Sequence, residues 1–136
     1  MTNARRIAVI EGDQLVRELV RRWLGDARHV VELHSVSSTI GAVDLIVADV
    51  ANPRAASPLL VRLLQTHSNI PVLLLSARFR AGQGGSVQLA TELGVAAVLP
   101  KPFTQRQLLA AVRQSLTMRG KARSQPRSTS TRASNE

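Results

Sequence analysis

The stretch Val43-Asp44-Leu45-Ile46-Val47-Ala48-Asp49-Val50 is an almost unbroken apolar run that meets a carboxylate near its end. A continuous apolar run of this length predicts a strand buried on both faces, as in a parallel sheet. Ligands of such sheets bind outside the carboxyl ends of the strands, so Asp49 is positioned for chemistry. Asp49 can equally be a turn residue before Asn52-Pro53, and this stretch alone leaves both interpretations open.

Four further apolar segments alternate with helical patterns along the chain. The segments are residues 6–10, 30–33, 72–75 and 96–99, and the helical patterns fall at 15–24, 58–65, 86–93 and 104–118, with room for at most two helical turns at 35–42. Strands that alternate with helices form parallel sheets covered on both faces. The sequence therefore predicts an α/β fold, a doubly wound parallel sheet of five strands.

Several helix ends carry recognisable capping residues. Asp13 is placed to cap the first helix, and Gly25 is expected to close it. Gly94 is expected to close the helix at 86–93, and Thr104 with Gln107 forms a capping box for the last helix.

The composition describes one globular domain. The 136 residues are 44% hydrophobic with a mean hydropathy of +0.02, which is sufficient for a core. The absence of cysteine excludes disulfides and thiolate metal sites. No apolar run approaches the roughly 20 residues of a membrane span, and the first apolar stretch is too short for a signal peptide. We therefore expect a cytoplasmic protein with no membrane partner.

The net charge of +9 is densest at the C-terminal end: residues 1–118 hold 13 Lys+Arg against 8 Asp+Glu, and residues 119–136 hold 5 against 1. Residues 119–136 contain almost nothing apolar and cannot offset their ordering entropy, so we expect a folded unit at 4–118 and a basic disordered tail at 119–136. Aromatic residues are only 2% of the chain, which provides no platform for stacking bases. Nucleic acid is therefore not the expected partner, and the tail is interpreted as an idle end or a loose tether.

Polar residues follow four of the five predicted strands: Glu11, Asp49, Ser76 and Lys101. The carboxyl ends of parallel strands lie at one edge of a sheet, so these side chains should gather there. Two acids, a hydroxyl and a lysine can hold a divalent cation and a phosphoryl group.

Three motifs around these residues resemble the receiver (CheY-like) domain of bacterial two-component response regulators, over residues 5–117. VDLIVAD, with Pro53 four residues after Asp49, is similar to the phosphoacceptor strand and its loop. PVLLLSAR is similar to the fourth strand with its Ser/Thr, and GVAAVLPKPF to the fifth strand with its lysine-proline pair. The resemblance implies the flavodoxin-like strand order 2-1-3-4-5.

The resemblance also implies roles for these residues. Asp49 would be the phosphoacceptor, Lys101 would pair with the phosphoryl oxygens, and the Ser76 hydroxyl would move to meet them. Mg²⁺ would be held by Glu11, by Asp49 and by the backbone carbonyl of Ala51. Such a domain catalyses only its own phosphorylation and is not otherwise an enzyme. The Lys101-Pro102 bond would be cis.

The implied partners are proteins. A sensor histidine kinase or a phosphotransfer protein would supply the phosphoryl group to a stand-alone receiver. A downstream protein would dock on the fourth and fifth helices, at 86–93 and 104–118.

The chain departs from the family pattern at three places. Receivers normally end the first strand with two adjacent acids, whereas here the pair is Glu11-Gly12, so a direct metal ligand is missing. Asp13 can replace that ligand or act only as the helix cap. Val98 stands where many receivers carry an aromatic switch residue, and the helix at 35–42 is short. Two interpretations therefore stay open: a phosphorylatable receiver that binds magnesium weakly, or a pseudo-receiver that acts as a phosphorylation-independent interaction module.

Overall fold

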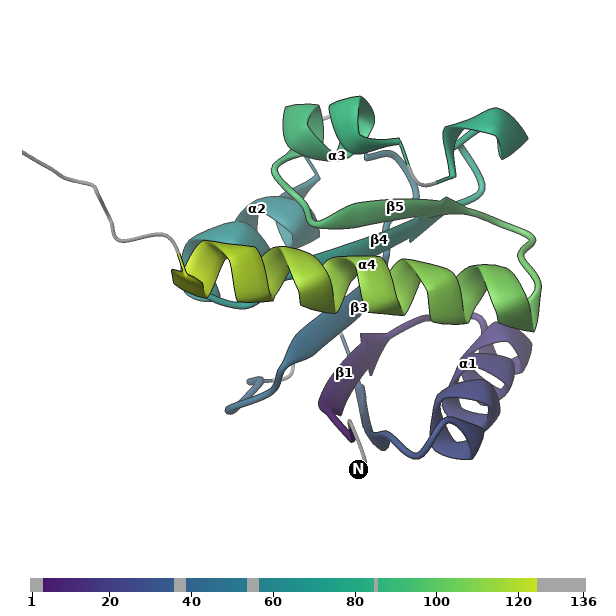
Figure 1. Ribbon diagram of the computed structural model, residues 1–136. Coiled ribbons are helices and arrows are strands. Elements are labelled where there is room, and N and C mark those ends of the chain that lie inside the picture. Colours follow the sequence, from purple (N-terminus) through teal and green to yellow (C-terminus); the bar gives the residue numbers. More distant parts are fainter. Residues whose placement is uncertain (1–3, 36–38, 54–56, 85, 125–136) are drawn as a thin grey trace, which may run out of the picture.

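The computed structural model describes residues 4–35, 39–53, 57–84 and 86–124. In chain order its elements are β1 (Arg6–Ile10), α1 (Gln14–Asp26), β2 (Val30–His34), β3 (Leu45–Asp49), α2 (Pro58–Thr66), β4 (Val72–Ser76), the 3₁₀ helix η1 (Ala81–Gln83), α3 (Val87–Leu93), β5 (Ala97–Pro100) and α4 (Gln105–Ser124). Figure 1 shows these elements along the chain. No helix among the described residues is long and apolar enough to cross a membrane.

The five strands form one sheet in the order β2-β1-β3-β4-β5, and every neighbouring pair is parallel. The predicted fold class and strand order are therefore confirmed. The order reverses between β1 and β3, so the carboxyl ends of these two strands border the crevice where ligands of open α/β sheets bind.

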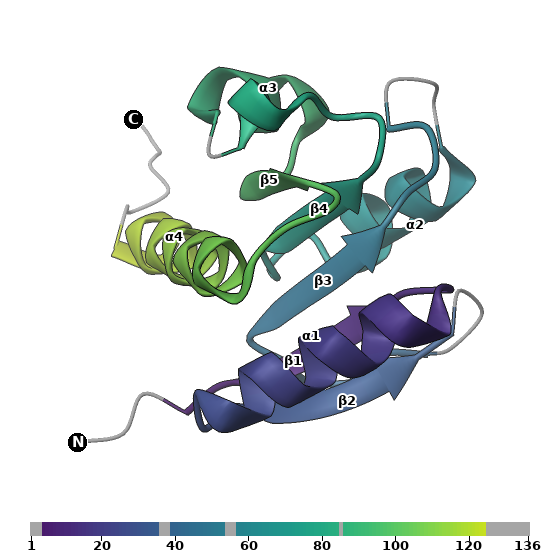
Figure 2. The same ribbon diagram turned by 90° about the vertical axis from the view of Figure 1, so that its right-hand side faces the viewer.

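Two apolar clusters fill the two sides of the sheet. One lies under α1 and α4, and the other lies under α2 and α3. Figure 2 shows α4 and α2 on opposite sides of the sheet. Successive strand residues point to opposite faces, so Ile7 and Val9 enter the first cluster while Ala8 and Ile10 enter the second. Because both sides are covered, β3 and β4 have the continuous apolar sequences expected of central parallel strands.

Helix ends carry side-chain and glycine caps, some of them predicted. The Ser57 and Ser86 hydroxyls, which were not predicted as caps, accept hydrogen bonds from the first turns of α2 and α3. Gly94 ends α3 with φ 76°, a left-handed conformation that favours glycine. Thr104 and Gln107 exchange both bonds of the predicted capping box, at 2.8 and 3.1 Å.

The end of α1 differs from the prediction that Gly25 closes it. The helix continues through Gly25 to Asp26, and the chain reverses at Arg28, which has φ 72°. The His29 amide donates to the Leu24 carbonyl at 3.1 Å, and the Val30 amide donates to a carbonyl preceding β1 at 2.9 Å. The start of β2 therefore fixes where the reversal occurs, and the arginine takes the left-handed position.

The predicted end of the last helix at Met118 is also corrected, because α4 continues to Ser124. The boundary of the folded unit at residue 118 stays a prediction. The residues added to the helix include arginine, lysine and alanine, which are strong helix formers, and the next proline in the sequence is Pro126. The rest of the predicted disordered tail, residues 125–136, lies outside the described residues.

The connection from β2 to β3 contains no helix in its described residues, 35 and 39–44. Two residues of this connection, Ile40 and Val43, are instead buried in the cluster under α2 and α3. The middle of the region predicted as a short helix, residues 36–38, lies outside the described residues.

The side of β2 that faces this connection is partly polar. Glu32 and His34 share a sheet face with their register partners Ala8 and Ile10. Glu32 accepts a hydrogen bond from Arg6 at 2.7 Å and lies 3.1 Å from His34 Nε2. Glu32 thus has two polar neighbours on this face of the sheet.

Candidate functional site

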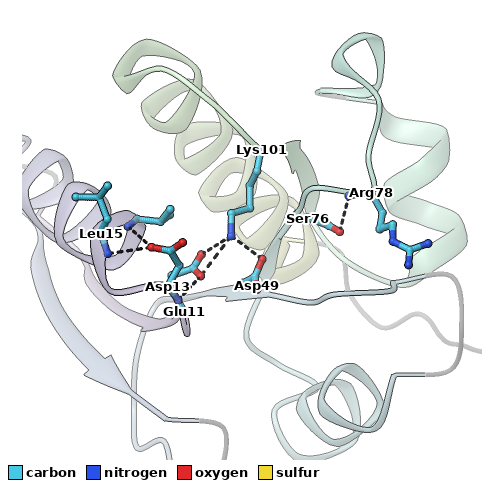
Figure 3. Close-up of polar contacts among 8 residues, drawn as sticks. Glu11, Asp13, Leu15, Asp49, Ser76, Arg78 and Lys101 are labelled. Carbon is cyan, nitrogen blue, oxygen red and sulfur yellow. Dashed lines mark hydrogen bonds and ion pairs between the residues drawn. The ribbon is translucent and has the colours of Figure 1, made fainter.

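The side chain of Lys101 lies between two carboxylates at the carboxyl edge of the sheet (Figure 3). Its Nζ donates to Asp49 Oδ1 at 3.0 Å and to the two oxygens of Glu11 at 3.1 and 3.3 Å. The structure thus brings together three of the four residues that the sequence placed at this edge.

The sheet topology explains why these three residues meet. Glu11 follows β1, Asp49 ends β3, and Lys101 follows β5, so each leaves the sheet at the same edge. The Lys101 amide donates to the Ser76 carbonyl at 3.1 Å, which fixes the start of its loop. The Lys101-Pro102 bond is cis, as the resemblance implied.

Burial and charge act in opposite directions on Lys101. Burial lowers the pKa of the Lys101 ammonium, but its bonds to Asp49 and Glu11 outweigh that effect, so the pKa is raised overall. The lysine side chain is 17% exposed and that of Glu11 only 1%. Asp49 is 26% exposed, so the carboxylate predicted to accept the phosphoryl group is the most accessible of the three.

Glu11 is held on both sides. Its Oε2 also accepts a hydrogen bond from the Asp13 amide at 3.0 Å. A buried carboxylate is costly unless it is paired and hydrogen-bonded, and Glu11 meets both conditions. Glu11 was predicted as a metal-site residue, and its direct bond to Lys101 was not anticipated from the sequence.

Asp13 caps α1, as predicted. Its Oδ1 accepts hydrogen bonds from the amides of Leu15 and Val16 at 2.9 and 3.1 Å (Figure 3). One carboxylate oxygen is thereby committed to the helix. Metal binding by Asp13 stays a prediction.

The oxygen donors at this edge are of the kind that Mg²⁺ prefers, but few are charged. Within the described part of the chain, no three Asp, Glu or His residues are grouped so that they could hold a metal ion. The carboxylates of Glu11 and Asp49 and the backbone carbonyl of Ala51 fit a cation chemically. Gly12 is exposed, and a Cβ built on it meets no atom within 4 Å. An acid at position 12 would therefore fit without clashes.

Ser76 ends β4 and is completely buried. Its hydroxyl accepts a hydrogen bond from the Arg78 amide at 3.0 Å (Figure 3). Asp49 is the register partner of Leu75, so Ser76 lies one residue beyond it on the neighbouring strand. The predicted movement of this hydroxyl toward a phosphoryl group would require it to exchange this local bond.

Val98 is completely buried in the cluster under α2 and α3. A valine has no ring that could alternate between an inward and an outward position. Any coupling of Ser76 to the surface in this protein must therefore use other residues.

Comparison with known proteins agrees with this geometry. No protein-family model matches the chain. The chain is 34% identical over 120 residues to the response regulator MprA of Mycobacterium sp. (strain KMS), which covers 82% of this chain and 50% of the relative. The chain therefore spans about half the length of the curated relatives it matches.

Solved structures show the same fold. The receiver domain of HemR from Leptospira biflexa superposes with a TM-score of 0.62 at 26% identity, over 82% of this chain and 94% of that one. The chemotaxis response regulator CheY4 of Vibrio cholerae gives a TM-score of 0.63 at 20% identity, over 83% and 99% of the two chains.

The sheet order, the residues at its edge and these similarities define a signalling domain of the CheY-like class. The chain belongs to the receiver domains of response regulators. This membership supports a role in two-component signalling.

Proposed function

We propose that this receiver accepts a phosphoryl group on Asp49 from a sensor histidine kinase or a phosphotransfer protein, in the cytoplasm of a bacterium. The observation that carries the proposal is the contact of 3.0 Å between Lys101 Nζ and Asp49 Oδ1. This contact joins an accessible carboxylate at the end of a central strand to the Lys101 ammonium, a cation that can pair with phosphoryl oxygens.

The transfer forms one bond and breaks another. An oxygen of Asp49 bonds to phosphorus while the bond from phosphorus to a histidine nitrogen of the donor breaks, which yields an acyl phosphate. The lysine ammonium stabilises the negative charge on the phosphoryl oxygens, since phosphoryl transfer depends mainly on positioning and charge neutralisation. Ser76 would supply a hydroxyl donor after release from the Arg78 amide.

Magnesium would be held by Glu11, Asp49 and the carbonyl of Ala51. When bound, the cation would neutralise charge on the transferred group. We propose that it binds weakly, because Glu11 is already engaged by Lys101 and position 12 contributes no carboxylate.

The direct test is incubation with acetyl phosphate and magnesium followed by intact mass measurement. Wild type should gain one phosphoryl group, with acetate as the leaving group, and Asp49→Asn should gain none. If the wild type gains none under conditions that modify an ordinary receiver, the proposal is wrong.

The second candidate is a pseudo-receiver that binds partners independently of phosphorylation. Gly12 favours it, because the acid that normally binds the metal directly is absent. Affinity capture from the source cell with wild type and Asp49→Ala separates the two candidates. A phosphoacceptor should lose or gain partners with the substitution, and a pseudo-receiver should keep the same set.

The proposed surface for a downstream protein lies on α3 and α4, the fourth and fifth helices when the short segment at 35–42 is counted. A hollow of about 260 Å³ lies on the α4 side of this surface and is bordered by Gly84, Pro100, Gln107 and Gln114 among others. Its lining is uncharged and can admit a partner side chain.

A further inference from the structure

A second hollow, of about 410 Å³, lies beside the candidate site on the side of β2. It opens between the carboxyl ends of β1 and β2 and the first turns of α1. Its lining includes Glu11, Gly12, Arg17, Leu33, His34 and Ser35. Its volume is within the range of small-molecule sites in proteins, which are about 300–1,000 Å³.

Arg17 gives this hollow a positive wall. The residue is half-buried on α1, and none of the salt bridges found among the described residues involves it. A guanidinium carries its charge at all ordinary pH values and presents several donors suited to carboxylate and phosphate groups. The imidazole of His34 adds a second polar group on the β2 side.

Glu11, the one carboxylate in the lining, already accepts hydrogen bonds from the protein. Both oxygens of Glu11 accept from Lys101, at 3.1 and 3.3 Å, and one also accepts from the Asp13 amide. Its side chain is only 1% exposed. Lys101 is shared with Asp49 and so offsets the charge of Glu11 in part, whereas no salt bridge among the described residues offsets the charge of Arg17.

The hollow also has an apolar part and free space. Leu33 is 44% exposed, although it lies on a strand of the sheet, and it provides the apolar surface of the lining. Gly12 has no side chain to fill the hollow. An apolar surface beside an arginine is the combination that binds an organic anion, with the arginine fixing the charged end.

We propose that this hollow binds a small organic anion, a carboxylate or phosphate attached to an apolar body, with Arg17 as its charged contact. Binding does not require phosphorylation of Asp49, so this inference stands apart from the proposed function. The carboxyl group of Glu11 lies in the wall of the hollow and also bonds to Lys101, so an occupant would lie next to the phosphoacceptor site.

The test is a titration followed by the amide NMR signals of Gly12 and Ser35. The probes are phenylacetate, phenyl phosphate, inorganic phosphate and the neutral benzyl alcohol. At least one of the two aromatic anions should shift both signals saturably, and the inorganic anion and the alcohol should bind at least about tenfold more weakly. The two aromatic anions together show whether the site prefers a carboxylate or a phosphate.

Two substitutions on α1 provide a matched pair. Arg17→Gln should weaken the better probe by about tenfold or more, because a charged hydrogen bond is lost. Arg22→Gln removes the same charge from an exposed position of the same helix and should leave the affinity within about twofold. Spectra of the free variants confirm that both remain folded.

A third variant, Gly12→Asp, adds a negative charge to the lining and should also weaken the anion. The inference is overturned if no probe gives saturable shifts, if benzyl alcohol binds as well as the anions, if inorganic phosphate matches phenyl phosphate, or if Arg22→Gln weakens binding as much as Arg17→Gln does.

Discussion

Glu11 and Asp49 share one lysine, and the two carboxylates differ in what they contribute. Asp49 is partly exposed and can exchange Lys101 for water, whereas Glu11 is buried and cannot. The hydrogen bond that Lys101 donates to Glu11 therefore contributes to stability, while the one that it donates to Asp49 places the lysine beside the reacting group. Lys101 thus contributes both to the stability of the fold and to the proposed phosphoryl transfer.

Replacing Glu11 with glutamine should destabilise the fold by about 1–3 kcal/mol, because a buried charged hydrogen bond to Lys101 is weakened. The measurement is urea unfolding of both proteins. Glu18→Gln is the matched control, since Glu18 pairs with Arg21 at 2.7 Å but both side chains are about half exposed. Exposed pairs contribute about 0–1 kcal/mol. Equal losses in the two variants would contradict the structural role given to Glu11.

Gly12→Asp should tighten magnesium binding and speed the phosphorylation of Asp49 by acetyl phosphate, because a hard cation gains a carboxylate ligand. The space at position 12 is open, so the fold should be unaffected. Calorimetry gives the affinity. Gly41→Asp adds the same charge at another open position, outside the candidate site, and should change neither quantity. An unchanged affinity in Gly12→Asp would mean that Asp13 already supplies the ligand.

His29 should make the stability depend on pH. Burial lowers the pKa of His29, and Arg5 lowers it further; its Nδ1 also accepts a hydrogen bond from the Arg5 amide at 3.1 Å. The unfolded chain therefore binds this proton more readily than the folded chain. The contribution is fully present above the ordinary pKa of 6.5 and is lost as the pH falls through the lower folded value.

The free energy of unfolding, measured by urea titration at pH 7.5 and at pH 5, reports this loss. The decrease should be smaller in His29→Gln, whose amide oxygen can accept the same bond without titrating. His67→Gln is the control, and an equal reduction in both variants would show that His29 is not responsible.

At the scale of elements, the backbone conformation after α1 is one that its residue does not favour, because the pairing of β2 with β1 determines where the chain reverses. A non-glycine residue in the left-handed region is strained, and Arg28 occupies that region with φ 72°. Arg28→Gly should therefore stabilise the protein by about 0.5–1 kcal/mol. Thermal unfolding measures the change.

The control for this substitution is Arg22→Gly, in the middle of the same helix. A glycine there should destabilise by about 1 kcal/mol, because the residue has helical geometry and no strain to relieve. The two substitutions remove the same side chain type, so opposite signs are expected. A loss of stability in both would show that Arg28 contributes more through its side chain than through its backbone.

For the whole molecule, the sequence predicted the sheet because its signals were long and local. The run from Val43 to Val50 and the capping residues of α2, α3 and α4 depend on neighbours in sequence, and the structure follows them. The Gly25 prediction was wrong because the end of α1 depends on where β2 pairs with β1. The predicted end of the last helix at Met118 was wrong because helix propensity continues beyond that residue.

The candidate site was likewise predictable in part, where its features depend on local sequence and topology. The grouping of Glu11, Asp49 and Lys101 at one edge could be predicted from strand ends, since parallel topology fixes that edge. The direct bond of Lys101 to Glu11 depends on side-chain reach across β4 and β3, and the hollow near Arg17 depends on the packing of α1 against β2. Neither leaves a local pattern in the sequence. The residue types at the strand ends and the motifs around them were the signals that the sequence offered.

Deletion of the C-terminal segment tests where the cooperatively folded unit ends. Among the described side chains of α4, the buried and partly buried ones lie between Leu108 and Leu116, and the sequence of residues 119–136 offers almost nothing apolar to pack against the sheet. Deleting residues 119–136 should therefore leave the melting temperature and the phosphorylation of Asp49 unchanged, as measured by calorimetry and intact mass.

The deletion removes five basic residues and one acid. Any affinity of the full chain for duplex DNA should be weak, independent of sequence and steeply reduced by salt, because counterion release would be its only source. A truncated chain that melts earlier, or that binds DNA as well as the full chain, would place the boundary or the basic surface elsewhere.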